Sequence, residues 1–366
     1  MHVEVAIIGG GIAGLSCAAN LGSDVSAVVL EAEPTLGYHA TGRSAALYTE
    51  CYGSRTIHAL TTASRTYLTE LHPQTSTPRG LMFVAPSGDE EAIANLMVEF
   101  GPLVPSLLRL TPTDVEQSCG LFPTSLVAGG VYEKGARDID VDALLSSFAS
   151  TARVNGVTVM TSAPVTAIER SSGGWTVVTS DFQYTADVVV NAAGAWGDRI
   201  AAMAGVAPLG LIPLARSVFT CDPGQDPQAW PMIVDARERW YLKPEGPHLL
   251  GSGASEIPSE PMDARVDERD VALGIEKVTT ASTLNIRSVK NTWAGLRTFA
   301  PDRIPVAGFD PDHPGFFWLV GQGGYGIMTS PALGALAGCL VRSLAIPEEL
   351  SNCGVSVEDL DPLRLR

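Results

Sequence analysis

Positive charge is scarce along this chain. Its 366 residues contain 24 lysines and arginines against 40 aspartates and glutamates, which gives a formal net charge of −16. Such an excess of negative charge argues against nucleic acid or an anionic membrane surface as a partner, and it mainly favours solubility. A pocket that binds an anion would therefore stand out in this protein.

Patterns that hold metals or build disulfide frameworks are also missing. The six cysteines are scattered without a C-x-x-C pair, and the six histidines show no metal-ligand spacing. In a chain of this length, isolated cysteines are typical of free thiols in a reducing compartment. We expect neither a disulfide framework nor a metal site.

Long hydrophobic runs are absent. No stretch approaches the roughly 18 apolar residues of a membrane helix, and no signal-peptide pattern opens the chain. Hydrophobic residues make up 45% of the chain and charged residues 17%, which is typical of a globular protein. The length suits two closely joined domains. We expect a cytoplasmic protein without an integral membrane segment.

The first thirty residues carry the pattern of a strand, a helix and a second strand. Residues 3–8 form a short apolar run, which is typical of a parallel strand buried on both faces. Residues 12–21 are small and apolar and predict a helix, with Gly22 placed to end it. Residues 25–30 predict the second strand. Together they predict a right-handed βαβ unit.

A glycine loop joins the first strand to the helix. It reads Gly9-x-Gly11-x-x-Gly14, and Glu31 follows the second strand. Gly9 permits the turn, Gly11 lets a pyrophosphate approach the backbone, and Gly14 lets helix and strand pack closely. The helix start, at Ile12 and Ala13, offers free N–H groups to phosphates, and Glu31 is placed to accept hydrogen bonds from a ribose. The sequence therefore predicts a dinucleotide site.

The glycine loop alone does not decide between FAD and NAD. An arginine–serine segment near residue 43 and a late glycine-rich loop at residues 321–326 favour FAD, because a nicotinamide enzyme needs neither. Residues 316–320 predict a buried strand that feeds the late loop. A final helix is expected to begin near residues 329–331, with Ser330 as its cap and Pro331 in its first turn.

Nucleotide-type elements occur at the start, middle and end of the chain, so two domains are expected to be interleaved. The fold class is α/β, with a Rossmann-type FAD-binding domain and an antiparallel-sheet substrate domain. The FAD-binding domain is expected to comprise residues 1–52, 140–210 and 300–366. The substrate domain is expected to comprise residues 53–139 and 211–299.

Alternation along two expected strands of the substrate domain points to a carboxylate site. Arg239, Tyr241 and Lys243 share one face of the first. In the second, Arg297 shares a face with Gly295, whose missing side chain leaves room for a ligand. An arginine beside a glycine in an apolar strand suggests a guanidinium that binds a carboxylate through paired hydrogen bonds.

Three segments carry a family resemblance: Tyr-His-Ala-Thr-Gly-Arg-Ser-Ala-Ala at 38–46, Asn-Ala-Ala-Gly-Ala-Trp at 191–196 and Gln-Gly-Gly-Tyr-Gly-Ile at 322–327. They resemble the D-amino acid oxidase-type FAD-dependent oxidoreductase superfamily. Within it, the chain most resembles the bacterial D-arginine dehydrogenases. Similarity at residues 216–217, 241–244 and 292–297 extends the resemblance over nearly the whole chain.

The resemblance implies a set of site residues. Around FAD it implies Arg43, Ser44, Ala45, Val165, Ala193, Gly194, Trp196, Gly323, Tyr325, Gly326, Ile327 and Met328. Against the substrate it implies Arg297, Tyr241 and Arg216 at the carboxylate, Tyr52 closing the pocket, and Gly324 facing the substrate. The final helix would point its positive end toward the flavin, where negative charge builds on reduction.

Two positions depart from the D-arginine dehydrogenase pattern. Leu81 replaces a glutamate that receives the substrate guanidinium, and Leu47 replaces an active-site histidine. A desolvated cationic side chain would have no partner there, so neutral and apolar substrates are expected. His39 matches a histidine that is tied covalently to FAD in sarcosine and dimethylglycine dehydrogenases. The D-arginine dehydrogenase motif keeps this histidine without the bond, so non-covalent FAD is expected.

The reaction that the resemblance implies is oxidation of a D-amino acid. A hydride passes from Cα to flavin N5, and the imino acid hydrolyses to a 2-oxo acid and ammonia. No His, Asp or Glu offers itself as a general base at the matched positions, and the Gly324 carbonyl is placed to hold the amine. Two alternatives stay open: a glycine, sarcosine or N-methyl amino acid oxidase of the same superfamily, and a non-catalytic flavin-binding subunit. The electron acceptor (a quinone, an artificial acceptor or oxygen) is also open.

Overall fold

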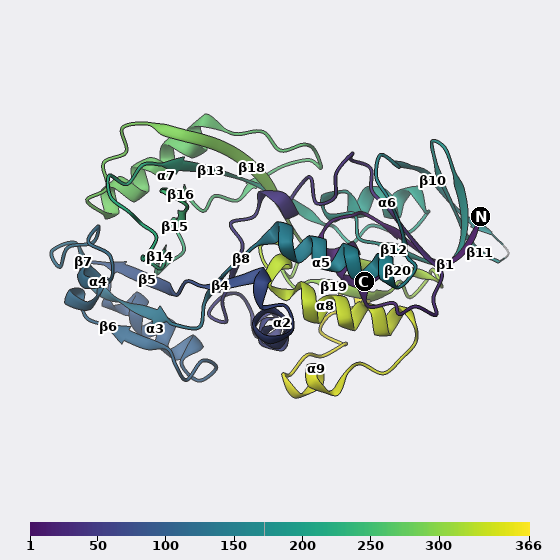
Figure 1. The fold of residues 1–366 in the computed structure, drawn as a ribbon, viewed down its shortest axis with the longest axis horizontal. Coiled ribbons are helices and arrows are strands. Elements are labelled where there is room, and N and C mark those ends of the chain that lie inside the picture. The colour runs from purple at the N-terminus through teal and green to yellow at the C-terminus, as the bar shows by residue number, and fades with distance from the viewer. Residues whose placement is uncertain (172) are drawn as a thin grey trace.

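Two large sheets make up most of the computed structural model, which describes residues 1–171 and 173–366. In Figure 1 one sheet occupies the right half of the molecule and the other the left, with helices α2, α5 and α8 between and below them. A small sheet of β3 (Leu47–Tyr48), β4 (Ser76–Pro78) and β8 (Arg137–Ile139) lies between the large ones.

The first sheet has a parallel core in the order β9-β2-β1-β12-β20. β19 extends it antiparallel beyond β20, and the hairpin β10–β11 continues from the first half of β12. The strands come from the start, middle and end of the chain, as the nucleotide-type elements predict. Their bounds are β1 (His2–Ile8), β2 (Ala27–Leu30), β9 (Thr158–Met160), β10 (Val165–Ser171), β11 (Gly174–Thr179), β12 (Gln183–Asn191), β19 (Val306–Phe309) and β20 (Phe316–Val320).

Both faces of this sheet are buried where the strands of the parallel core are apolar, as in the second half of β1 and in β2 and β20. On β1, Val5 and Ile7 pack into one core cluster, while Ala6 and Ile8 pack into another. The first cluster is covered by helices α1 (Ile12–Ala19), α2 (Arg55–Thr66), α5 (Val141–Val154) and α8 (Gly326–Val341). The second is covered by the hairpin β10–β11 and by α6 (Gly197–Met203).

The second sheet joins two chain segments that lie far apart in sequence. Its order is β17-β13-β16-β15-β14-β5-β7-β6, with β18 on the other edge of β13. Helices α3 (Glu90–Phe100), α4 (Pro112–Ser118) and α7 (Glu268–Ala281) pack against it. The strands are β5 (Leu81–Pro86), β6 (Leu108–Leu110), β7 (Val127–Glu133), β13 (Ile212–Cys221), β14 (Met232–Asp235), β15 (Tyr241–Glu245), β16 (His248–Ser252), β17 (Ile257–Pro258) and β18 (Val289–Phe299).

One pair of strands departs from the mainly antiparallel pairing of the second sheet. β5 and β14 run parallel, with Leu81 opposite Met232 and Phe83 opposite Val234. These strands come from different segments, so no hairpin turn forces them to be antiparallel. The sheet is therefore mixed.

The last long helix begins earlier than the sequence pattern indicates. α8 starts at Gly326, so Ser330 is not its cap and Pro331 lies inside it. Proline cannot donate a backbone hydrogen bond to the carbonyl four residues earlier. The Ser330 hydroxyl instead donates to the Ile327 carbonyl at 2.9 Å, and the Ala332 N–H finds the Ser64 hydroxyl at 3.1 Å. These side-chain partners let the helix run through the proline.

Shorter elements complete the chain. α2 continues into a π-helical turn at Tyr67–Leu71, and α9 (Glu348–Asn352) follows α8. Single 3₁₀ turns lie at Thr41–Arg43, Pro73–Thr75, Gly194–Trp196 and Pro362–Leu365. Among the described residues, no helix combines the length and apolarity that a membrane crossing needs.

Candidate active site

A cavity of about 980 Å³ lies where the two large sheets meet. It extends from the carboxyl ends of β1 and β2 to the inner face of the second sheet. Such a volume is at the upper end for ligand sites, so it suits a dinucleotide together with a small substrate.

Of the predicted site residues, only Gly14 does not line the cavity. On the cofactor side the lining comprises Gly9, Gly11, Ile12, Ala13, Glu31, Arg43, Ser44, Ala45, Val165, Ala193, Gly194, Trp196, Gly323, Tyr325, Gly326, Ile327 and Met328. On the substrate side it comprises Leu47, Tyr52, Leu81, Arg216, Tyr241, Arg297 and Gly324.

The glycine loop has the geometry that its sequence predicts. Gly9 has a φ of +111°, and a Cβ there would collide with the Ala192 carbonyl oxygen. A Cβ on Gly14 would collide with the Gly9 carbonyl oxygen, so Gly14 serves the close contact between helix and strand. Gly11 faces the cavity and leaves its backbone open to a ligand. The loop thus forms the floor of a site for a phosphate-bearing group.

Glu31 lies at the end of β2 and lines the cavity. Its two carboxylate oxygens accept hydrogen bonds from the Gly10 N–H at 2.6 Å and the Glu33 N–H at 2.8 Å. These bonds fix the carboxylate beside the glycine loop. Each oxygen keeps a lone pair that can accept a hydrogen bond from a ribose hydroxyl.

Buried polar atoms without partners show that the cavity walls fit a polar cofactor. The Nδ1 of His39 and the Nε2 of Gln322 are both buried and lack a hydrogen-bond partner among the described residues. Both residues line the cavity. Unpaired buried polar atoms cost free energy unless a ligand or water satisfies them. The other ring nitrogen of His39, Nε2, lies 2.9 Å from the Glu33 carboxylate, and the ring packs against Trp196.

Helix α8 points its N-terminus into the cavity. Gly326, Ile327 and Met328 form its first turn, and all three line the cavity. N–H groups in a first turn have no partner within the helix, and the helix dipole places partial positive charge there. The earlier start of α8 therefore brings this positive end closer to the predicted flavin position than a helix starting near Ser330 would.

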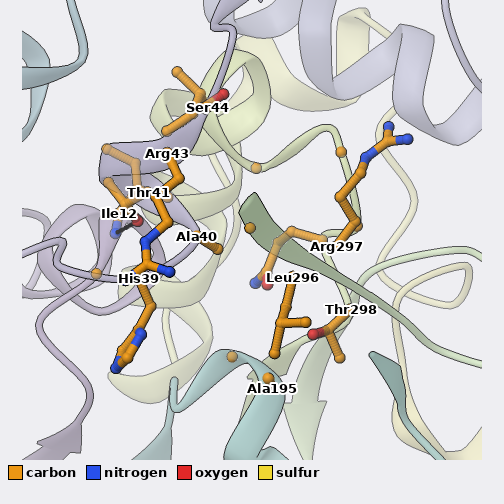
Figure 2. Close-up of a pocket in the computed structure, with 18 of the residues that line it drawn as sticks. Ile12, His39, Ala40, Thr41, Arg43, Ser44, Ala195, Leu296, Arg297 and Thr298 are labelled. Carbon is orange, nitrogen blue, oxygen red and sulfur yellow. Dashed lines mark hydrogen bonds between the residues drawn. The ribbon is translucent and has the colours of Figure 1, made fainter. Parts of the chain in front are cut away.

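Arg43 lines the cavity, and its guanidinium is held by protein groups. Its guanidinium donates to the carbonyls of Ala264 and Ala294 at 3.1 Å and pairs with Asp263 at 2.5 Å. Figure 2 shows it with Thr41 and Ile12 on one side of the pocket, opposite the strand that carries Arg297. A Cβ on Gly295 would lie 3.3 Å from the Arg43 Cβ. A side chain at residue 295 would thus meet Arg43, and both Gly295 and Arg43 line the cavity.

Arg297 supplies the free guanidinium of the substrate end. It points to the other side of β18 from Leu296 and Thr298 (Figure 2). Among the described residues its one hydrogen bond goes to the Tyr52 hydroxyl at 2.6 Å. Burial alone would lower the pKa of Arg297, but the phenol groups of Tyr52 and Tyr241 outweigh it and raise the pKa. Arg297 is thus a charged donor with one hydrogen bond, to Tyr52, and one carboxylate within ion-pair distance, that of Glu256 at 3.8 Å. Its remaining N–H groups suit a substrate carboxylate.

Arg216 lies on the same face of the sheet. β13 pairs with β18 so that Arg216 is opposite Gly295, two residues from Arg297. Its Nε and Nη2 donate to the backbone carbonyls of Ser255 and Ala254, both at 2.9 Å. Burial, followed by repulsion from Arg297, lowers the pKa of Arg216. Most of its donors are thus committed to protein, which leaves Arg297 as the main free donor.

Apolar side chains form the wall beside this guanidinium pair. Leu81 and Phe83 project from alternate positions of β5, and Met232 and Val234 do the same on the neighbouring strand β14. Leu47 packs into the same cluster. Leu47 and Leu81, which replace polar residues of the D-arginine dehydrogenase pattern, therefore lie on the same apolar wall of the cavity.

The charged residues of the cavity that were not predicted from the sequence include Glu238, Glu256 and Arg303. Arg303 binds Glu256 through both Nη atoms, at 2.7 and 3.1 Å. Burial would raise the pKa of Glu256, but Arg303, Arg297 and Arg216 outweigh it and lower the pKa. Burial raises the pKa of Glu238, against the pull of Arg297 and Arg216. Both Glu238 and Arg303 have positive φ, at +56° and +64°, but no glycine or asparagine marks these turns in the sequence.

Known proteins share both the sequence pattern and the fold. The profile of the FAD dependent oxidoreductase family matches residues 4–340. Glycine oxidase from Geobacillus kaustophilus is 24% identical over 361 residues, 93% of each chain. Its solved structure superposes with a TM-score of 0.83 at 22% identity, covering 94% of this chain and 95% of that one.

Two further proteins extend the comparison. Human dimethylglycine dehydrogenase is 25% identical over 364 residues; the match covers 91% of this chain but 42% of that protein. The structure of L-proline dehydrogenase from P. horikoshii superposes with a TM-score of 0.84 at 22% identity, over 99% of this chain and 97% of that one. The predicted superfamily, the Rossmann-type fold and the FAD cofactor are thereby confirmed. The chain belongs to the FAD dependent oxidoreductase family.

Proposed function

We propose that this protein oxidises the C–N bond of a neutral, mainly apolar D-amino acid. The observation that carries the proposal is the largely buried guanidinium of Arg297, which makes one hydrogen bond to protein and lines the same cavity as a wall of apolar side chains. A zwitterionic amino acid offers a carboxylate to the first and an apolar side chain to the second. The D configuration rests on the resemblance of the motifs at residues 38–46 and 322–327 to D-arginine dehydrogenases.

In this proposal the protein contributes mainly orientation. Arg297 holds the substrate carboxylate, and Tyr52 fixes the guanidinium from the other side. The hydroxyl of Tyr241 makes no hydrogen bond to another described residue, so it is available as a second donor to the carboxylate. Holding the carboxylate fixes Cα relative to the cofactor, and such positioning is a large part of catalysis.

FAD, when bound, supplies the acceptor for the hydride that leaves Cα. The substrate loses that hydride and one proton from nitrogen, and becomes an imino acid. Water then adds to the imine carbon, and ammonia leaves to give a 2-oxo acid. Gly324 lies against the guanidinium of Arg297. Its backbone carbonyl is the proposed acceptor for the substrate amine.

A second candidate is oxidation of glycine or an N-methyl amino acid. It is supported by the likeness to glycine oxidase over nearly the whole of both chains. The apolar wall favours the first candidate, because glycine has no side chain that could contact Leu81, Phe83 and Met232. An unfilled apolar space forfeits binding energy.

Anaerobic reduction of the bound flavin tests the proposal. The yellow protein is mixed with D- and L-forms of leucine, methionine, phenylalanine and arginine, and with glycine and sarcosine. We expect bleaching by the apolar D-amino acids, more slowly by D-arginine, and 2-oxo acid as product. Faster bleaching by glycine or sarcosine would support the second candidate. No bleaching by any amino acid would overturn the proposal and favour a non-catalytic flavin-binding subunit.

A further inference from the structure

A carboxylate already lies within reach of the arginines at the substrate end. Oε1 of Glu256 is 3.8 Å from an Nη atom of Arg216, 3.8 Å from one of Arg297 and 2.7 Å from one of Arg303. All four residues line the cavity. Glu256 therefore touches one arginine and stands near two others, in the region where a substrate carboxylate is proposed to bind.

The loop that carries Glu256 is fixed in place. Arg216 holds the carbonyls of Ala254 and Ser255, and Lys277 donates to the Gly253 carbonyl at 2.8 Å. Ala254 has a φ of +52°, a conformation that a non-glycine residue adopts at a cost. Glu256 is thus held by its own backbone as well as by Arg303, and its position does not depend on a ligand.

Glu256 also occupies the guanidinium of Arg303. Both Nη atoms of Arg303 bind the carboxylate, and its Cζ lies 3.9 Å from the centre of the Phe299 ring. The Phe299 ring also lies beside Arg297, whose Cζ is 5.6 Å from the ring centre. Without the charge of Glu256, Arg303 would present a second free guanidinium to the cavity, on the ring that it shares with Arg297.

Charge balance then decides which anions the cavity accepts. Arg216, Arg297 and Arg303 contribute three positive charges, and Glu256 and Glu238 contribute up to two negative ones. The net charge of these five groups is then +1, which one substrate carboxylate neutralises. A second carboxylate would meet Glu256 instead of a free cation, and like charges at close range are strongly unfavourable.

We infer that Glu256 makes the substrate end selective for monocarboxylates, by pairing with Arg303 and excluding a second acid group. This inference rests on the proposed function, since it concerns the same site. It predicts that neutralising Glu256 admits dicarboxylic ligands, such as D-glutamate and D-aspartate among amino acids.

The test compares Glu256→Gln with the wild-type holoenzyme. Kd values for isovalerate and glutarate, one with a single acid group and one with two, are measured from the change in flavin absorbance. Glu256→Gln is expected to shift the Kd ratio toward glutarate by at least roughly tenfold. The ratio of kcat/KM for D-glutamate over D-leucine should shift in the same direction.

Glu91→Gln is the matched control. Glu91 is an exposed glutamate that pairs with Arg237 at 3.4 Å, and neither residue lines the cavity. It should leave the Kd ratio unchanged. An equal shift in Glu91→Gln, or no shift in Glu256→Gln, would overturn the inference.

A second variant covers the case in which Glu256→Gln fails to retain flavin. In Arg303→Ala the carboxylate of Glu256 loses its nearest partner and is left to compete for Arg297. Isovalerate should then bind at least roughly tenfold more weakly. Unchanged isovalerate binding would contradict the inference. If no amino acid reduces wild-type flavin, the proposed function fails, while the two Kd measurements still decide the role of Glu256.

Discussion

Gly324→Ala gives a sharp test of the substrate site. A Cβ at residue 324 would collide with the guanidinium of Arg297, at its Nη2, Cζ and Nε atoms. The colliding group is the far end of a flexible side chain, so the fold can adapt. The nearest guanidinium atom, Nη2, would lie 1.6 Å from this Cβ, so restoring an ordinary contact of about 3.5 Å requires it to retreat by about 2 Å.

Such a retreat would displace the carboxylate anchor and break its alignment with Tyr52. A misplacement of about 1 Å at a positioning group costs roughly 100-fold in rate. At about 1.36 kcal/mol per tenfold, this corresponds to about 2.7 kcal/mol of transition-state stabilisation. The thermal unfolding midpoint should hardly change, because no backbone contact is affected.

The assay is the rate of flavin reduction by D-leucine in a stopped-flow instrument, over a range of substrate concentrations. Gly120→Ala is the matched control, since nothing lies within 4 Å of a Cβ at that position. We expect kcat/KM to fall about 100-fold in Gly324→Ala and to stay at the wild-type value in the control. Wild-type kcat/KM in Gly324→Ala, with flavin retained, would refute the assignment of Arg297 as the carboxylate anchor.

Three other predictions concern specificity, cofactor attachment and stability. Leu81→Glu should raise kcat/KM for D-arginine relative to D-leucine by at least roughly tenfold, because the new carboxylate can pair with the cationic side chain of the substrate. Leu81→Met is the control, and an equal ratio of kcat/KM values in the two variants would contradict the placement of Leu81 in the substrate pocket. Acid precipitation should release the flavin into the supernatant, and a yellow pellet would instead indicate a covalent bond, with His39 as the candidate. Asp310 is buried and accepts hydrogen bonds from His313, Trp318 and Arg366, which outweigh burial and lower its pKa. A lowered carboxyl pKa stabilises the fold above the ordinary value of 3.8 and the stabilisation is lost as pH falls below it. Asp310→Asn should therefore lower the free energy of unfolding, measured in urea, by roughly 1–3 kcal/mol at pH 7 and by less below the ordinary carboxyl pKa of 3.8. A loss of stability that does not depend on pH would contradict this account.

Local sequence signals predicted the nucleotide-binding features well. The roles of Gly9, Gly11 and Gly14 follow from backbone sterics within one turn, so neighbouring residues are sufficient to specify them. The same holds for the strand that places Arg297 on the inner face, because alternation along a strand is a local property. The superfamily, its fold and its FAD cofactor are accordingly confirmed, while the individual substrate contacts stay predictions.

Sequence signals failed where distant segments supply the partner. The start of α8 was misplaced because Ser330 and Pro331 have the composition of a helix start. The helix continues through them because the Ser64 hydroxyl, 268 residues from Ala332, accepts the N–H of Ala332. The contact between Gly295 and Arg43, which lies 252 positions earlier in the chain, was also not predicted.

The sequence by itself thus determined the βαβ unit, the glycine loop and the apolar character of positions 47 and 81. The tertiary structure alone decided that β5 lies parallel to β14 and that Glu256 and Arg303 meet at the substrate end. The physical reason is range: turn sterics and strand alternation act between near neighbours. The balance of charge in a cavity depends on groups that only the packing of two sheets brings within a few ångströms of one another.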